Sequence, residues 1–116
     1  RRRLQDAVEC HLESEVPLGA FLSGGVDSSA VVAQMTRLLD RPVRTFSIGF
    51  AEEAYDESRH AAQVARALGA EHRELVVRPD AEEFIERVVL GFDEPFADSS
   101  ALPTSLVARL AREDVT

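Results

Sequence analysis

The sequence predicts an α/β fold in which a parallel sheet carries helices on both faces. Three segments of strand length, at 16–22, 43–48 and 71–77, alternate with longer segments whose apolar residues recur at helical spacing. Strands that alternate with helices of about 10–15 residues are typical of βαβ units, in which the strands are parallel. The chain has 116 residues, of which 45% are hydrophobic. That length and composition suit one small globular domain with a modest core.

Local signals place each element in order. Leu4, Val8 and Leu12 recur at i, i+4 and i+8 and indicate a first helix. Pro17 suits the entrance to the first strand, and Gly69 stands where the C-terminal cap of a helix belongs. The predicted helices cover about 1–15, 27–39, 56–68, 80–90 and 103–113, the predicted strands cover 16–22, 43–48 and 71–77, and the predicted loops cover 49–55 and 91–100.

The order of the elements predicts a sheet that is truncated after three strands. Residues 114–116 resemble the entrance to a fourth strand, where the sequence stops. A sheet of so few parallel strands is thin, and an edge without a neighbour leaves self-association into a homo-oligomer open. The sequence also has no initiator methionine. We therefore expect a fragment that begins inside a longer protein.

Charge and composition exclude several classes of protein. The net charge is −8, whereas nucleic-acid binding normally requires a basic surface, so no nucleic-acid partner is expected. All 13 basic residues are arginine, which excludes a Walker A loop and Schiff-base chemistry from this segment because both need a lysine. No apolar run approaches the roughly 18 residues of a membrane helix, so no membrane partner is expected. Cys10 is the only cysteine, which precludes an internal disulfide and fits the cytoplasm.

The most informative segment follows the first predicted strand and opens the next helix. It reads Leu22-Ser23-Gly24-Gly25-Val26-Asp27-Ser28-Ser29. Its two glycines allow positive φ and close approach to a ligand, while the free amides and the dipole of a helix start favour phosphate. A carboxylate beside phosphates would repel them unless a divalent cation lies between, so Asp27 suggests Mg²⁺. Composition alone is equally compatible with a glycine-rich turn in which Ser and Asp cap the helix.

The segment 23–28 matches the S-G-G-x-D-S signature of the PP-loop ATP-pyrophosphatase superfamily, whose members cleave ATP between the α and β phosphates. Other segments resemble asparagine synthetases in particular; they are 16–19, 45–50, 55–57, 72–75 and, most distinctively, Asp93–Thr104. The resemblance extends from about residue 4 onward. It implies a Rossmann-like fold of the adenine nucleotide alpha hydrolase type, with 1–116 as the N-terminal part of the ATP-pyrophosphatase domain.

The resemblance also implies roles for individual residues. The residues that would bind the nucleotide are Leu22, Ser23, Gly24, Gly25, Val26, Asp27, Ser28, Ser29 and Ile48. Among these, Asp27 would also hold Mg²⁺, and Leu22 and Ile48 would contact the adenosine part of ATP. Asp98, Ser99 and Ser100 would line the acceptor pocket, although they suit equally a helix entrance capped by one of the serines. No residue is predicted to act as a covalent catalyst.

The implied reaction is ATP-dependent amide formation on a small-molecule substrate. The β-carboxylate of aspartate attacks the α-phosphorus of ATP to form β-aspartyl-AMP, and ammonia, supplied from glutamine in the full protein, then displaces AMP to give asparagine. A glutaminase domain is expected before Arg1 and a second acidic loop just after Thr116, so the isolated chain is expected to lack synthetase activity. Two alternatives stay open: a sister PP-loop ligase such as a β-lactam synthetase-like enzyme, and a nucleotide-binding module without catalysis.

Overall fold

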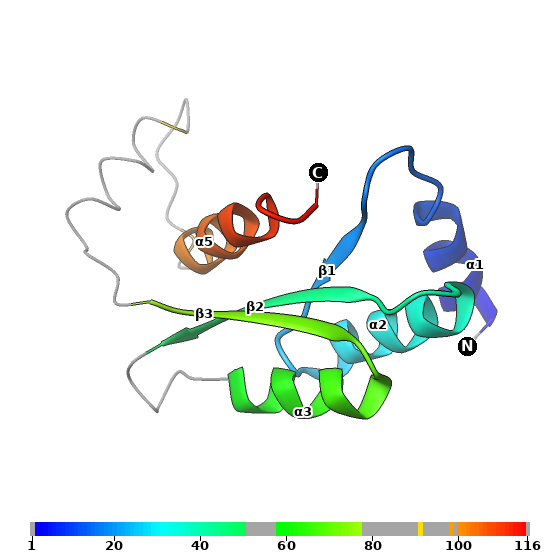
Figure 1. Ribbon diagram of the computed structural model, residues 1–116, viewed down its shortest axis with the longest axis horizontal. Coiled ribbons are helices and arrows are strands. Elements are labelled where there is room, and N and C mark those ends of the chain that lie inside the picture. The colour runs from blue at the N-terminus through cyan, green and yellow to red at the C-terminus, as the bar shows by residue number, and fades with distance from the viewer. Residues whose placement is uncertain (1, 51–57, 78–90, 92–97, 99, 116) are drawn as a thin grey trace.

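The structure, a computed structural model, describes residues 2–50, 58–77, 91, 98 and 100–115 (Figure 1). Its elements are, in order, α1 (Arg2–His11), β1 (Gly19–Phe21), α2 (Val26–Leu38), β2 (Arg44–Phe50), α3 (Ser58–Leu68), β3 (Glu71–Val77) and α5 (Ala101–Ala111). The helix predicted at 80–90 and most of the loops predicted at 49–55 and 91–100 lie outside the described residues. Gly91, which we expected to begin a loop, is helical.

The strands form the predicted parallel sheet, in the order β1-β2-β3. The central strand β2 pairs with β1 from Arg44 to Phe46 and with β3 along its whole length. In Figure 1, α3 lies on one side of the sheet and α5 on the other. The predicted α/β architecture with helices on both faces is therefore confirmed. It directs the carboxyl ends of all three strands toward the same edge, where ligands bind in open α/β sheets.

One core fills the face of the sheet that carries α1, α2 and α3. Its fully or almost fully buried members are Val8, Leu22, Val32, Met35, Val43, Ala61 and Ala65. The helix α3 can lie close to the sheet because its buried residues are all small: Ser58, Ala61 and Ala65. It ends at Gly69, where φ is +66°, and the amide of Ala70 donates to the carbonyl of Ala65 at 2.9 Å. The predicted glycine cap is thus confirmed as a left-handed C-terminal cap.

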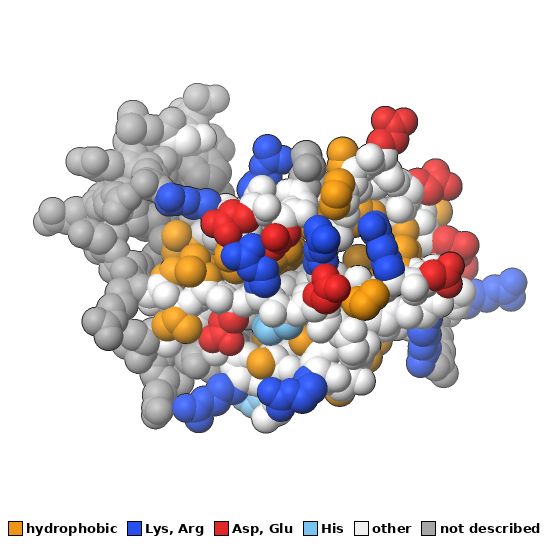
Figure 2. All heavy atoms as spheres, in the orientation of Figure 1, with side chains coloured by type: hydrophobic (Ala, Val, Ile, Leu, Met, Phe, Trp, Pro, Cys, Tyr) orange, Lys and Arg blue, Asp and Glu red, His pale blue; other side chains and the backbone are white. Residues whose placement is uncertain are grey.

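The opposite face carries a smaller core under α5. Phe46 of β2 is 1% exposed and packs with Val107, Leu110 and Ala111. Charged groups connect the segment after α5 to the sheet. Arg73 of β3 pairs with Glu113 and Asp114. The guanidinium of Arg44 donates to the carbonyl of Asp114 at 2.8 Å. Figure 2 shows basic and acidic side chains interleaved on one face of the molecule.

The structure corrects several predicted boundaries. The first helix ends at His11 instead of about residue 15, because the hydroxyl of Ser14 bonds locally to the carbonyl and amide of Val16 and competes with helical bonds. The strand predicted at 16–22 has only three residues, with Val16 41% exposed. The strand β2 continues through Phe50, which was predicted to lie in a loop, because β3 extends equally far and pairs with it.

The prediction that 114–116 form the entrance to a fourth strand stays a prediction, because Thr116 lies outside the described residues and neither Asp114 nor Val115 is in a strand. A turn follows α5 over 112–114, and the amide of Val115 donates back to the carbonyl of Ala111 at 2.8 Å. Val115 then packs against the core around Phe46. Local helical bonds and burial therefore hold this segment against α5.

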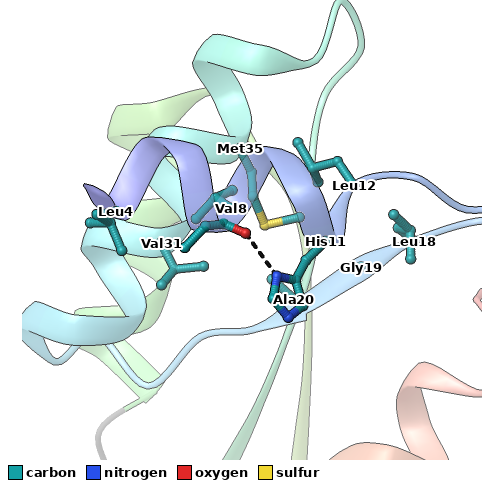
Figure 3. A pocket seen from close by; sticks show the side chains of 10 residues that line it. Leu4, Val8, His11, Leu12, Leu18, Gly19, Ala20, Val31 and Met35 are labelled. Carbon is teal, nitrogen blue, oxygen red and sulfur yellow. Dashed lines mark hydrogen bonds between the residues drawn. The ribbon is translucent and has the colours of Figure 1, made fainter. Parts of the chain in front are cut away.

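An apolar pocket of about 390 Å³ lies between α1, β1 and α2 (Figure 3). Leu4, Val8, Val31 and Met35 line it, and the ring of His11 is engaged through Nδ1 with the carbonyl of Ala7 at 2.7 Å. It lies beside the amino end of β1, away from the carboxyl ends of the strands, so we do not place the functional site here. Among the described residues, no helix is both long and apolar enough to cross a membrane.

Candidate functional site

The predicted phosphate loop connects the carboxyl end of β1 to the first turn of α2. The amide of Leu22 donates to the carbonyl of Phe46 at 2.9 Å, which extends the alignment with β2 by one residue. Gly24 then turns the chain with φ +82°, a conformation that L side chains rarely adopt. Gly25 is the N-cap residue of α2 and, having no side chain, makes no capping hydrogen bond. The helix start is therefore left open.

Gly24 also lets the loop touch the start of α3. A Cβ atom at this position would lie 2.6 Å from the backbone nitrogen of Ala61 and 2.6 Å from the Cβ of His60. Only glycine fits this contact without movement of the neighbouring backbone. The contact brings the amino-terminal turn of α3 beside that of α2, so the positive ends of two helix dipoles meet at this edge of the sheet.

The serine hydroxyls of the loop hold it in shape. The hydroxyl of Ser23 lies 3.0 Å from that of Ser28 and accepts a hydrogen bond from the amide of Gly25 at 3.2 Å. The hydroxyl of Ser28 donates to the carbonyl of Gly25 at 3.3 Å. These bonds arrange the loop without a ligand, so little reorganisation is needed when an anion arrives.

The open start of α2 has the chemistry of an anion site. The first helical bond runs from the amide of Ser29 to the carbonyl of Gly25 at 3.0 Å, so the amides of 26–28 have no partner within the helix. Val26 is 86% exposed and Asp27 is also exposed, which leaves this turn accessible. Such amides, together with the helix dipole, favour phosphate.

Asp27 is the carboxylate available for a cation at this turn. Among the described residues there is no group of three histidines, cysteines or carboxylates that could form a metal cage. A full cage is not required for Mg²⁺, which commonly takes one or two carboxylates and completes its shell with phosphate oxygens and water. An exposed carboxylate beside an anion site fits that donor set, so Asp27 would hold the ion jointly with the phosphates.

Two predicted nucleotide-binding residues have buried side-chain atoms. The side chain of Leu22 is 1% exposed and belongs to the core, so only its backbone is positioned to meet a ligand. The hydroxyl oxygen of Ser29 is buried and has no hydrogen-bond partner among the described residues. Buried hydroxyls are normally bonded, so Ser29 is a position where a ligand or a local shift would supply a partner.

A pocket of about 320 Å³ opens beside the loop at the carboxyl ends of β1 and β2. It includes the predicted Ile48 and extends to the first turns of α3 and α5. The residues that line it are Phe21, Ser23, Ser47, Ile48, Phe50, Ser58, Pro103, Thr104 and Val107. Mostly apolar walls with a few hydroxyls are the usual surroundings of a bound nucleoside.

A buried polar row underlies this pocket. Thr45 and Ser47 of β2 are 0% and 4% exposed, and both hydroxyls reach the ring of His72 on β3, at 2.9 Å from Nδ1 and 3.2 Å from Nε2 respectively. Burial lowers the pKa of His72 below its ordinary value, a shift that the nearby carboxylate of Glu74 partly opposes. The ring is therefore neutral near pH 7, so one of its nitrogens donates and the other accepts.

The structure describes Asp98 and Ser100, two of the three residues predicted to line the acceptor pocket. Ser99 lies outside the described residues. The carboxylate of Asp98 accepts from the amide of Ser100 at 2.8 Å, and this bond, followed by one from the Ser100 hydroxyl, lowers the pKa of Asp98. Ser100 is the N-cap residue of α5, but its side chain makes no capping bond. Asp98 thus closes the start of α5, and neither it nor Ser100 lines the pocket.

Sequence reasoning missed Ser47, Ser58 and Thr104, which line the pocket, and the role of His72 beneath it. The alternation in 43–48 did indicate that Ser47 is buried, because alternate residues of a strand share one face and Ser47 therefore lies on the same face as the apolar Val43. Thr104 comes to the site only because α5 crosses the sheet near the end of β2, and no local pattern predicts that approach.

The fold and the loop together define a class: an α/β domain of the PP-loop type, in which a helix start at the end of a parallel strand is left open and has the chemistry of an anion site. The particular family is also clear. The family model for asparagine synthase matches residues 1–116, and the chain belongs to that family.

The curated relatives extend well beyond this chain. Asparagine synthetase [glutamine-hydrolyzing] 1 of Bacillus subtilis is 39% identical over 119 residues, which cover 100% of this chain and 18% of the relative. Asparagine synthetase [glutamine-hydrolyzing] 3 of the same organism is 32% identical over 110 residues, covering 82% of this chain and 18% of that relative. The chain therefore spans about a fifth of the length of these relatives.

A solved structure supports the fold. The NH3-dependent NAD synthetase of Campylobacter jejuni, solved in complex with nitrate, superposes with a TM-score of 0.57 over 97% of this chain and 50% of that chain. Since the sequences are 18% identical, this likeness concerns the fold alone. It agrees with the parallel α/β sheet described above.

Proposed function

We propose that this chain is the N-terminal part of the ATP-pyrophosphatase domain of a ligase that converts aspartate to asparagine through β-aspartyl-AMP. In the full protein, ammonia would come from glutamine, and the enzyme would work in the cytoplasm. The observation that carries the proposal is the open start of α2 at 23–29, which adjoins a pocket of nucleoside size in a chain that the asparagine synthase family matches throughout.

The proposal gives each part of the site a task. The amides and hydroxyls of 23–29 bind the β and γ phosphates, which leave together as pyrophosphate. Ile48 and the backbone of Leu22 contact the adenosine part in the adjoining pocket. Asp27 would hold Mg²⁺, whose charge offsets that of the pyrophosphate when the ion is bound.

The chemistry needs positioning rather than a protein nucleophile. The β-carboxylate of aspartate attacks the α-phosphorus, the bond to the bridging oxygen breaks, and pyrophosphate departs on the loop. Ammonia then attacks the activated carbonyl, loses a proton and releases AMP. Holding the reacting groups in line and stabilising the charge of the leaving group are sufficient sources of rate.

Exchange of labelled pyrophosphate into ATP tests the proposal, measured with the longest natural polypeptide that contains this chain, Mg²⁺ and a panel of carboxylic acids. We expect exchange that requires aspartate and that is lost in Asp27→Ala. Asp40→Ala is the matched control, because Asp40 is an exposed aspartate beyond the opposite end of α2 and should leave exchange unchanged.

Each other outcome points to a different function. Exchange driven by another acid would retain PP-loop chemistry but indicate a sister ligase such as a β-lactam synthetase-like enzyme. Binding of ATP without exchange for any acid would indicate a nucleotide-binding module without catalysis. Exchange that survives in Asp27→Ala would remove this carboxylate from the site.

A further inference from the structure

A row of three side chains connects the edge strand β3 to the floor of the pocket. Thr45, His72 and Ser47 share the face of the sheet that carries α3, and His72 stands between the two hydroxyls. The hydroxyl of Thr45 also lies 3.4 Å from the carbonyl of Glu71. Ser47 is the only member of the row that lines the pocket in the part of the chain that the structure describes.

Counting donors assigns the tautomer of the ring. If Nδ1 carries the hydrogen, it donates to Thr45, Thr45 donates to the carbonyl of Glu71, and Ser47 donates to Nε2, so all three contacts become hydrogen bonds. If Nε2 carries the hydrogen, Thr45 must donate to Nδ1 and its contact with Glu71 is lost. Buried polar groups favour the arrangement that satisfies more of them, which is the Nδ1–H form.

We propose that His72 is a positioning residue for nucleotide recognition, which fixes the hydroxyl hydrogen of Ser47 away from the pocket and so presents the oxygen lone pairs of Ser47 to the ligand. Ser47 then accepts a hydrogen bond from an O–H or N–H donor of the bound nucleoside and disfavours an acceptor at the same place. This inference rests on the proposed function, because it assumes that the pocket holds the nucleoside of ATP.

The burial of Ser47 explains how His72 orients the Ser47 hydroxyl without touching the ligand itself. Ser47 is 4% exposed, so its hydroxyl has little access to water that could reorient it. A hydroxyl hydrogen in such a place points to the best fixed acceptor, which is Nε2 at 3.2 Å. The neutral state of His72 keeps that nitrogen an acceptor, and burial supports this state by lowering the pKa of the ring.

The tautomer can be measured in the free protein, without a ligand. Long-range ¹H–¹⁵N spectra of histidine-labelled protein, assigned by difference from His72→Gln, should show a protonated Nδ1 and an unprotonated Nε2. In Thr45→Val, which removes the hydroxyl at similar volume, the ring should shift toward the Nε2–H form. A protein that already holds His72 in the Nε2–H form would overturn the assignment.

A double-mutant cycle on ATP affinity tests the coupling. Removing one neutral hydrogen bond should weaken binding about fivefold to tenfold in Ser47→Ala, and His72→Phe should weaken it by a similar factor. In the Ser47→Ala background, His72→Phe should produce no further loss. Independent, multiplying losses would overturn the proposal. His11→Phe, in a distant exposed histidine of α1, is the control and should not change affinity.

Nucleotide analogues identify the donor and separate the two proposals. 2′-Deoxy-ATP, 3′-deoxy-ATP and purine riboside triphosphate each lack one candidate donor. One of them should bind more weakly than ATP to the unsubstituted protein but equally well to Ser47→Ala, and equal losses in both proteins would contradict the inference. If ATP does not bind at all, the proposed function fails as well, whereas binding with an uncoupled cycle rejects only the role of His72.

Discussion

Two helices of this chain begin at segments that the sequence marks as functional, and their starts differ. At the start of α2, the N-cap residue is Gly25, no side chain caps the helix, and the first turn is exposed. At the start of α5, the carboxylate of Asp98 already accepts the amide of Ser100. One helix start is open to an external anion, while the other is occupied by an anion of the chain itself.

The difference bears on the proposed phosphate site, because the amides of a helix start can bind an anion only where the chain leaves them without partners. The dipole is similar in both helices, but the amides are not. The amides of 26–28 lack helical partners, whereas at α5 the amide of Ala101 donates to the carbonyl of Asp98 at 3.1 Å and Pro103 has no amide hydrogen. The preceding residues also differ: Gly25 makes no capping bond at α2, whereas at α5 the carboxylate of Asp98 accepts the amide of the N-cap residue Ser100. The difference therefore supports the proposal that the phosphates bind at 23–29 and that Asp98 has a local structural role at the start of α5.

Gly24→Ala should have the largest effect of the substitutions considered, because it alters the loop that leads to the open start of α2. The substitution combines a left-handed backbone with a 2.6 Å clash against α3, so the free energy of unfolding should fall by about 2–6 kcal/mol and ATP binding should be lost. Gly69→Ala is the matched control, since its φ is also positive but nothing lies within 4 Å; it should lose only about 1–2 kcal/mol. Urea unfolding compares them, and equal losses would refute the clash.

Ser29→Ala should separate stability from binding. The buried hydroxyl of Ser29 has no partner among the described residues, so its removal should raise the free energy of unfolding by about 1 kcal/mol while ATP affinity falls. Ser28→Ala should instead lower stability, because its hydroxyl bonds to Gly25 and Ser23. Thermal melts and ATP titration measure both quantities. Unchanged ATP affinity in Ser29→Ala would remove this residue from the site.

Asp98→Ala should open the start of α5 and lower stability slightly, without weakening ATP binding. The pKa of Asp98 is lowered by the amide of Ser100, so its contribution is present above the unfolded pKa of about 3.9 and is lost as the pH falls through the lower folded pKa. The difference in melting temperature between the two proteins should therefore shrink in acid. A strong loss of ATP affinity at pH 7 would contradict the capping assignment.

The smallest predicted effect concerns pH and His72. Because the folded pKa is lowered, the unfolded chain takes up the proton first, so stability should decrease as the pH falls below the unfolded value of about 6.5 and level off below the folded pKa. His72→Gln should remove this part of the pH dependence between pH 7.5 and 5.5. Urea midpoints at these two pH values provide the measurement, and an unchanged slope in the variant would argue against a buried neutral ring.

Sequence patterns predicted the elements better than their ends. Helical spacing, the glycine after α3 and the alternation in 43–48 depend on neighbours along the chain, and they gave the right architecture. The ends depend on competing partners: Ser14 stops α1 early, and pairing with β3 prolongs β2. Such partners are tertiary or local side-chain contacts that a propensity does not contain.

The candidate site was predictable in one part and not in the other, for the same reason. The phosphate loop could be predicted because its glycines, its position after a strand and its helix start all belong to one continuous segment. The pocket beside it could not, since it is assembled from β1, β2, α3 and α5. For 98–100 the sequence left an even choice between an acceptor pocket and a helix entrance capped by one of the serines. The fold adds a contact that the sequence did not predict: the side chain of Ser100 makes no capping bond, and its amide donates to the carboxylate of Asp98.

Hydrogen–deuterium exchange with and without ATP and Mg²⁺ tests the central claim most directly, measured in the longest natural polypeptide that contains this chain. Amides at 26–28 lack helical partners and should exchange quickly in the free protein, then slow strongly when phosphates bind them. The amides of 100–102 and 104 should change little, because Asp98 already engages that helix start and Pro103 contributes no amide hydrogen. Protection that appears at 100–104 and not at 26–28 would contradict the account.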